Sequence, residues 1–129
     1  MDGMGAFRKG GRWNSKGTYA VYTASSLALA RSELARHVNL ESVPDGFSIY
    51  KIEVPDQDYP SMAPLPDDWP EDPLSRSTQE LGDALLQNPA TLGLKVPSVC
   101  DPDSFNFILN PRSIYFSKVR VLQNYPFVP

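Results

Sequence analysis

Hydrophobic and polar residues follow two different periods along the chain, which predict strands in some segments and helices in others. Residues 18–23 are dense in aromatic and β-branched residues and predict a strand. In residues 27–38 the apolar positions recur at helical spacing, which predicts a helix with one packed face. Ser25 or Ser26 precedes that helix and is a suitable N-cap. The first part of the chain therefore predicts a strand followed by a helix.

The remainder of the chain carries four more strand-like segments and one helix signal. The predicted strands span residues 47–54, 92–99, 105–109 and 119–122. We expect the last of these to be a half-buried edge, because polar and apolar residues alternate along it. A capping-box pattern begins at Ser77 and predicts a helix that turns Leu81, Ala84 and Leu85 inward. Together these elements predict a compact α/β (α+β) domain, with a mixed sheet and flanking helices.

Three segments predict turns or irregular structure. Residues 1–11 are glycine-rich without a period and predict an irregular lead-in. Residues 44–46 (Pro-Asp-Gly) predict a turn. The acidic stretch 56–73, counted with Pro55, contains six prolines and can form neither a helix nor a central strand. We expect it to be a long surface loop that Trp69 pins to the body of the protein.

Composition narrows the class of protein. The chain has 129 residues, which predicts a single domain over 1–129 with its own core. Its 12 Lys and Arg against 15 Asp and Glu give a net charge of −3, which disfavours direct binding to nucleic acid. No long apolar run predicts a membrane span, no secretory leader is recognisable, and the single cysteine, Cys100, fits a reducing compartment. We therefore expect a cytoplasmic protein, with Cys100 as a small core residue.

The most concentrated chemistry lies in the five residues Gly10-Gly11-Arg12-Trp13-Asn14. Two glycines allow a tight turn and a close approach to a ligand, and the guanidinium of Arg12 is suited to a planar anion. Trp13 and Asn14 add an aromatic and an amide group. This stretch predicts an anion-binding turn.

Three residues elsewhere are candidates to complete a site. Tyr22 lies in the predicted strand, and Glu33 lies on the helix that follows, one turn before His37. The spacing of Glu33 and His37 fits equally a solvated pair on a helix surface. Ser98 follows Pro97, which cannot donate to a sheet and so belongs at an edge or bulge, although a serine there is usually a turn residue.

Several chemistries are excluded by the motifs that the sequence lacks. There is no Gly-x-Gly-x-x-Gly between a strand and a helix, no P-loop, no paired Cys or His for a metal, and no nucleophile elbow. What remains is Arg12, Tyr22 and Glu33. An arginine holds a pyrophosphate, a tyrosine face stacks on a flat cationic ring, and a carboxylate stabilises an oxocarbenium-like transition state. This combination favours cleavage of the nicotinamide–ribose bond of NAD.

The same residues carry a resemblance to a known family. The chain resembles the RES domain family, the toxins of RES–Xre toxin–antitoxin pairs, in matching order from about residue 3 onward. The similar motifs are Gly-Gly-Arg-Trp-Asn at 10–14, Gly17, Val-Tyr-Thr at 21–23, Leu-Ala-Leu-Ala at 27–30 leading to Glu33 and His37, Val-Pro-Ser at 96–98, and Asn-Pro at 110–111.

The resemblance implies a fold, a substrate and site residues. It implies a fold related to diphtheria-toxin-like ADP-ribosyltransferases and NAD as the substrate, with growth arrest by NAD depletion or by ADP-ribosylation of a protein. The family's arginine, glutamate and serine correspond to Arg12, Glu33 and Ser98, and Tyr22 matches a tyrosine near the nicotinamide. We expect Arg12, with Asn14 beside it, to hold the pyrophosphate, Glu33 to stabilise the cation and Ser98 to fix the carboxamide or ribose. The mechanism needs no metal.

The resemblance also implies a partner, and it leaves alternatives open. An Xre-type helix-turn-helix antitoxin is expected to cover the cleft beside Arg12, and a homo-oligomer within that complex is possible. Relatives usually have a further N-terminal strand that carries an arginine, and Arg8 is the candidate to replace it. The alternatives are a protein ADP-ribosyltransferase, or a catalytically silent module that only binds the antitoxin.

Overall fold

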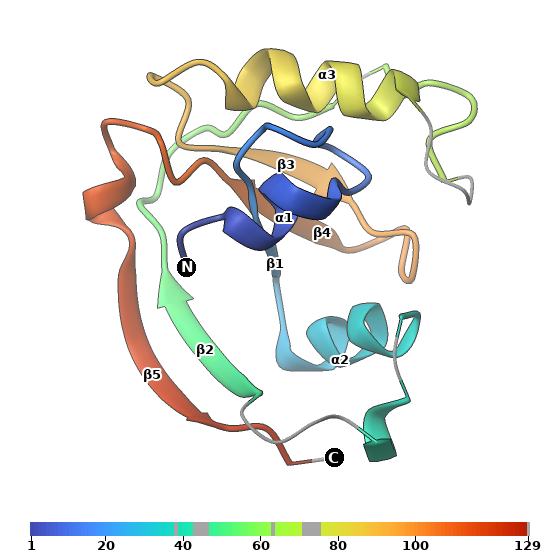
Figure 1. The fold of residues 1–129 in the computed structure, drawn as a ribbon, viewed down its shortest axis with the longest axis vertical. Helices are drawn as coiled ribbons and strands as arrows, with labels where there is room; N and C mark the ends of the chain where they lie inside the picture. Colours follow the sequence, from blue (N-terminus) through green and yellow to red (C-terminus); the bar gives the residue numbers. More distant parts are fainter. Residues whose placement is uncertain (38, 43–46, 63, 71–75, 129) are drawn as a thin grey trace.

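The computed structural model describes residues 1–128 except 38, 43–46, 63 and 71–75. Within this part the chain forms three α-helices, two short 3-10 helices and five strands (Figure 1). In chain order they are α1 (Met4–Lys9), β1 (Val21–Ala24), α2 (Leu27–Ala35), η1 (Leu40–Ser42), β2 (Ser48–Glu53), α3 (Arg76–Leu86), β3 (Gly93–Pro97), β4 (Phe105–Leu109), η2 (Phe116–Lys118) and β5 (Arg120–Pro126). The α+β fold class is confirmed.

The strands form two antiparallel sheets. The first has the order β1-β4-β3, so β4 is its centre and β3 an edge. The second is a two-stranded ribbon of β2 and β5, which curves along one side of the molecule (Figure 1). The mixed sheet expected from the sequence is therefore two separate antiparallel sheets in the described part of the chain. Alternation along a strand reports which face is buried, and it leaves the direction of the neighbouring strand open.

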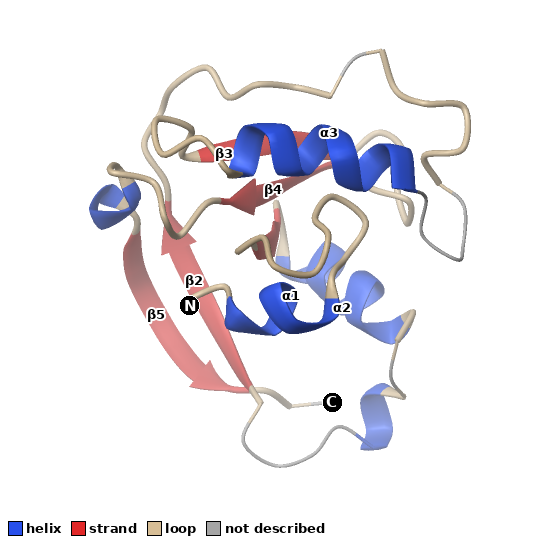
Figure 2. Ribbon diagram, turned by 45° about the horizontal axis from the view of Figure 1, so that its top comes forward, coloured by secondary structure: helices blue, strands red, loops and turns tan. Residues whose placement is uncertain are grey.

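The core lies between the three-stranded sheet, α3 and the loop after α1. Leu94, Val96 and Ile108 from β3 and β4 are at most 1% exposed, and they pack with Trp13, which is 2% exposed. Figure 2 shows α3 lying across β3. Trp69 is half-buried against this cluster, so the prediction that it pins the proline-rich loop is confirmed. The core therefore fixes Trp13, and with it the neighbouring Arg12.

The inward face of α3 differs from the prediction. Leu85 packs against the core as predicted, but Leu81 and Ala84 are exposed, and the buried residues are Thr78, Gly82 and Leu86. A Cβ at Gly82 would overlap the backbone carbonyl of Trp13, so the glycine allows the helix to lie directly against the loop. Close backbone contact therefore sets the rotation of the helix. The capping box is also wrong, because Ser77 lies inside α3 and its hydroxyl donates to Asp68 Oδ1 at 2.8 Å.

The N-terminal segment was predicted to be irregular, and this is wrong because α1 forms there. The helix is short and lacks an apolar period, and contacts made by residues further along the chain hold it. The side-chain amide of Asn14 donates to Ala6 O at 2.9 Å, and the Phe7 ring packs on Tyr19 with 4.4 Å between centroids. Gly10 ends the helix at a φ of 73°, a conformation that favours glycine.

Smaller differences concern the ends and the burial of other elements. The predicted strand at 18–23 begins only at Val21, because Thr18 O accepts a hydrogen bond from Asn14. The predicted N-cap of α2 is confirmed, since Ser26 Oγ accepts from Leu29 N at 3.1 Å. The predicted packed face of this helix is wrong, because Leu27 and Ala30 are exposed and Leu29 is the buried residue. β5 is an edge strand as predicted, but all seven of its residues are exposed, so the predicted half-burial is wrong. Val38 and the predicted turn at 44–46 lie outside the described residues.

Candidate active site

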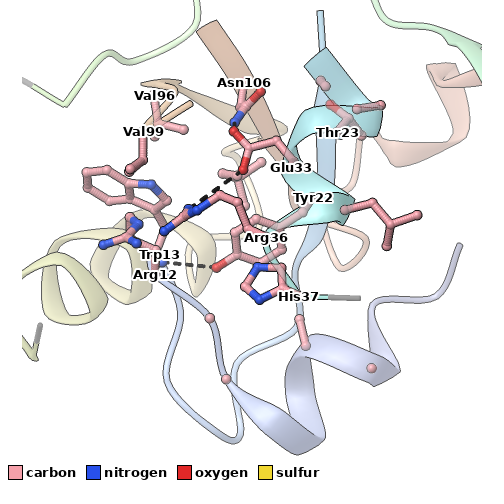
Figure 3. Close-up of a pocket in the computed structure, with 18 of the residues that line it drawn as sticks. Arg12, Trp13, Tyr22, Thr23, Glu33, Arg36, His37, Val96, Val99 and Asn106 are labelled. Atoms are coloured by element: carbon pink, nitrogen blue, oxygen red, sulfur yellow. Dashed lines mark hydrogen bonds and ion pairs between the residues drawn. The ribbon is translucent and has the colours of Figure 1, made fainter. Parts of the chain in front are cut away.

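A cavity of about 520 Å³ lies between α1, the loop after it, β1, α2 and the ends of β3 and β4. Arg12, Tyr22 and Glu33, three of the residues predicted from the sequence, line it. Figure 3 shows their side chains together with those of Arg36 and Asn106 around the same space. The fold therefore brings residues of the segment 12–36 together with Asn106, which is distant in the sequence.

Glu33 is held at the cavity wall by residues distant in sequence. Its Oε1 accepts a hydrogen bond from Ser98 Oγ at 2.6 Å and another from Asn106 Nδ2 at 3.0 Å. Its Oε2 lies 4.0 Å from a guanidinium nitrogen of Arg36. Its side chain is 26% exposed, so the carboxylate is partly withdrawn from solvent. The alternative interpretation was that Glu33 and His37 form a solvated pair on the helix surface. The contacts of the Glu33 carboxylate with residues of the sheet do not fit that interpretation.

Ser98 supports Glu33 from behind. Ser98 is fully buried at the end of the edge strand β3 and is not part of the cavity wall. Its Oγ accepts from the backbone N–H groups of Cys100 at 3.0 Å and Asp101 at 3.3 Å. Because those donors occupy the oxygen, the hydroxyl proton is directed at Glu33. Ser98 thus reaches the cavity through Glu33, whereas we expected it to bind the ligand directly.

The turn that carries Arg12 is fixed at several points. Gly11 N donates to Asn14 O at 2.9 Å, and Gln79 of α3 donates to Gly11 O at 3.0 Å. Arg12 itself donates through Nη1 to the backbone oxygen of Trp69 at 2.8 Å. The proline-rich loop therefore holds the guanidinium at the cavity, with its remaining N–H groups in a planar fork.

Asn14 organises the turn from within. It is 0% exposed and does not line the cavity, although we expected it to lie beside the ligand. Its Nδ2 donates to Ala6 O and Thr18 O, both at 2.9 Å, and its Oδ1 accepts from the Tyr22 hydroxyl at 2.6 Å. The amide therefore ties α1 and β1 to the turn.

The hydroxyl and the ring of Tyr22 lie in different environments. Its hydroxyl donates to Asn14 and accepts from Trp13 N at 3.0 Å, and burial raises the pKa of this phenol above its ordinary value of 10.0. The residue as a whole is 42% exposed, so the ring still lines the cavity while the hydroxyl is enclosed. A Cβ at Gly11 would lie 2.6 Å from this hydroxyl, which explains the glycine there. The ring is thereby held rigidly and presents a surface to the cavity.

Two residues that line the cavity beside Glu33, Arg36 and Asn106, were not predicted from the sequence. Arg36 lines the cavity one turn after Glu33, whereas Arg8, the predicted replacement for a missing arginine, is not in the cavity wall. Helical spacing from Glu33 is a signal that points to Arg36. Asn106 lies near the start of the central strand β4, and no local pattern distinguishes it. Lys9 also lines the cavity, so several cationic groups surround one carboxylate.

Cys100 lies next to this carboxylate. Burial, and then the charge of Glu33, raise the pKa of the Cys100 thiol above its ordinary value. Cys100 is partly exposed, so the prediction that it is a core residue is wrong. Among the described residues there is no group of three or more His, Cys, Asp or Glu that could hold a metal ion. None of the described helices has the length and apolar character to cross a membrane.

These features define a class of protein: a small α+β domain with a cavity lined by guanidinium groups, an aromatic ring and a carboxylate that is held by hydrogen bonds. The chain belongs to the RES domain family, whose model matches residues 1–128, and the resemblance seen in the sequence is confirmed. It is 39% identical over 112 residues to a protein named Toxin Res from Yersinia enterocolitica, covering 85% of this chain and 74% of that toxin.

Two further relatives agree with this assignment. The chain is 37% identical over 116 residues to the Prs ADP-ribosylating toxin of a Sphingobium species, covering 86% of this chain and 72% of the relative. It is 36% identical over 118 residues to Toxin Res of Photorhabdus laumondii, covering 90% and 76% of the two chains. The chain is thus a member of a family of toxins.

Proposed function

We propose that this protein is a toxin that consumes NAD by breaking the bond between nicotinamide and ribose. The observation that carries the proposal is the position of Glu33. Its carboxylate is held by Ser98 and Asn106 at the wall of a cavity that also contains Arg12 and the ring of Tyr22. A carboxylate so placed suits a reaction that develops positive charge on a sugar carbon.

The cavity suits a dinucleotide in size and in charge. Its volume of about 520 Å³ lies in the range of small-molecule sites. Arg12 and Arg36 both line it, and two guanidinium groups match the two negative charges of a pyrophosphate. The exposed ring of Tyr22 offers a flat surface for the nicotinamide, which is cationic while it is attached to ribose.

The chemical step follows from this placement. The bond between the ribose carbon and the pyridine nitrogen breaks, and its electron pair goes to the nitrogen, so that neutral nicotinamide leaves. The positive charge that develops on the ribose is stabilised by the carboxylate of Glu33, which also accepts a hydrogen bond from a ribose hydroxyl. Water, phosphate or a protein side chain then adds to the sugar carbon and loses its proton. No metal takes part in this scheme.

The experiment is to incubate the purified protein with NAD and follow nicotinamide release by chromatography. Glu33→Gln keeps the shape of the side chain and removes its charge, and we expect a fall in rate of roughly a hundredfold or more, from the size of comparable electrostatic effects. Glu41→Gln is the matched control, because Glu41 is exposed in η1 and does not line the cavity. The proposal fails if the wild type releases no nicotinamide, or if both variants behave alike.

A second candidate is transfer of ADP-ribose to a protein. The name of the Sphingobium relative, Prs ADP-ribosylating toxin, favours it. The breaking bond and the site residues are the same, and only the acceptor differs. NAD labelled in its adenylate half, added with a cell lysate, distinguishes the two: transfer gives a labelled protein band, and hydrolysis or phosphorolysis gives only small labelled products.

Growth arrest and pairing with an Xre-type antitoxin are proposed from the family resemblance, and so is a cytoplasmic location. A catalytically silent module that only binds the antitoxin is the remaining alternative. It predicts that the wild-type protein leaves NAD intact and does not arrest growth when expressed alone.

A further inference from the structure

We propose that Asn106 is a positioning residue for Glu33, and that with Ser98 it holds one carboxylate oxygen so that the other is presented to the substrate. The inference rests on the proposed function of the same cavity. No sequence motif and no part of the family resemblance assigns a role to Asn106. The proposal follows from three features of its surroundings.

The first feature is the convergence of two donors on a single oxygen. Ser98 Oγ and Asn106 Nδ2 both donate to Oε1 of Glu33, at 2.6 Å and 3.0 Å. Two donors in different directions fix the rotation of the carboxylate about its last bond, which is otherwise broad. Oε2 is left on the side of Arg36, 4.0 Å from its guanidinium. Since Glu33, Arg36 and Asn106 all line the cavity, Oε2 is the oxygen available to a ligand.

The second feature is a polar atom that the fold leaves unsatisfied. Oδ1 of Asn106 is buried and has no hydrogen-bond partner among the described residues. A buried acceptor without a partner weakens a fold, and native proteins contain few of them. An apolar residue at this position in β4 would avoid that penalty. The amide is therefore not explained by stability, and its one described hydrogen bond, to Glu33, explains it.

The third feature is the rigidity of the support. Asn106 lies in β4, the central strand, opposite Ala24 of β1 on one side and Val96 of β3 on the other. A donor on a central strand is held more precisely than one on a loop. Glu33 by contrast lies near the last turn of α2, which contacts the sheet mainly through β1. Asn106 thus ties a helix side chain to the central strand of the sheet.

The test compares Asn106→Leu, which is close to asparagine in shape, with Asn106→Val, which suits a strand. For both, kcat for nicotinamide release should fall about ten- to a hundredfold, as expected for one hydrogen bond to a charged group. KM for NAD should stay within about threefold, because ligand contacts are kept. The melting temperature should stay about the same, because removal of the unsatisfied Oδ1 offsets the loss of the hydrogen bond to Glu33. Asn124→Leu in exposed β5 is the matched control and should leave kcat unchanged.

Different outcomes overturn the proposal. A kcat like that of the wild type in either folded variant shows that Asn106 does not position Glu33. A marked fall in melting temperature shows a structural role, and a rise in KM alone shows a ligand contact.

A second measurement is independent of catalysis and of whether the Asn106 variants fold. The side-chain amide protons of Asn106, observed by NMR in the NAD-free protein, should shift and exchange faster in Glu33→Ala than in the wild type. Unchanged signals overturn the positioning role even if NAD is cleaved. A wild type that releases no nicotinamide overturns the proposed function, and these signals then decide whether the contact with Glu33 exists.

Discussion

The hydroxyl of Tyr22 holds the arginine turn together, so its removal is predicted to loosen that turn while leaving the ring in the cavity. In Tyr22→Phe the hydrogen bonds to Asn14 Oδ1 at 2.6 Å and from Trp13 N at 3.0 Å are both lost. Asn14 is 0% exposed, so water does not readily replace the lost donor. The ring that we propose to contact nicotinamide is unchanged. The substitution therefore separates the structural and ligand-binding roles of one residue.

The magnitude follows from the two groups left unpaired. A buried polar group without a partner costs about 1–3 kcal/mol, and the lower end of that range for each of the two groups gives a total of about 2 kcal/mol. For a domain of this size each kcal/mol lowers the melting temperature by about 4 °C, which gives a fall of about 8 °C. Because the turn carries Arg12, KM for NAD should rise more than kcat falls.

The assay is thermal unfolding of wild type, Tyr22→Phe and Tyr19→Phe. Tyr19 is the matched control, because its ring packs between Phe7 and Arg112 and no hydrogen bond of its hydroxyl is seen among the described residues. It should lose less than about 1 °C, as surface-like substitutions do. The reasoning is refuted if both variants unfold at the same temperature.

The dependence of stability on alkaline pH is a second test of the same hydroxyl. Burial raises the pKa of Tyr22 above its ordinary value of 10.0, so the folded state keeps the proton longer than the unfolded state does. The stability that this contributes is complete below pH 10 and is lost as the pH rises above it toward the folded pKa. Denaturant unfolding of wild type and Tyr22→Phe should therefore give a difference at pH 8 that shrinks at pH 11. A constant difference contradicts the assignment.

Two further predictions concern packing and the carboxylate. Gly82→Ala should destabilise the protein by about 3 kcal/mol, at the upper end for overpacking, because its Cβ would overlap a backbone carbonyl; Gly5→Ala, with no atom near its Cβ, is the control and should not destabilise. Equal melting temperatures for the two variants would contradict the packing of α3. Cys100 should be alkylated by iodoacetamide more slowly than a free thiol at pH 8, and faster in Glu33→Gln, since the Glu33 charge contributes to its raised pKa. A rate that does not increase in Glu33→Gln contradicts the proximity of the two groups.

Features that depend on residues close together in the sequence could be predicted. The capping hydroxyl of Ser26 predicted where α2 begins, because an N-cap acts within a few residues. The apolar spacing predicted a helix but the wrong packed face, since Leu27 is exposed and Leu29 is buried. The short helix α1 could not be predicted, because Asn14 and the Phe7–Tyr19 contact hold it from outside. The rotation of α3 depends on backbone contact at Gly82, which no periodicity reports.

The same distinction applies to the site. Arg12, Tyr22 and Glu33 were predicted because they lie within a short stretch that a strand and a helix fold together. The support for Glu33 comes from Ser98 and Asn106, which are 65 and 73 residues away. Nothing in the sequence distinguishes Asn106 from other asparagines in strands, because only the folded sheet brings it beside the carboxylate of Glu33. Arg36 was not predicted, although it lies one helical turn after Glu33 and lines the same cavity.

The most direct test of the central claim is a crystal structure of Glu33→Gln with NAD, since this variant should bind the dinucleotide and leave it intact. We predict NAD in the cavity between α1, β1 and α2, with its pyrophosphate hydrogen-bonded to Arg12, its nicotinamide against the ring of Tyr22, and its glycosidic carbon next to residue 33. An empty cavity at saturating NAD, or NAD bound elsewhere on the protein, would contradict the account.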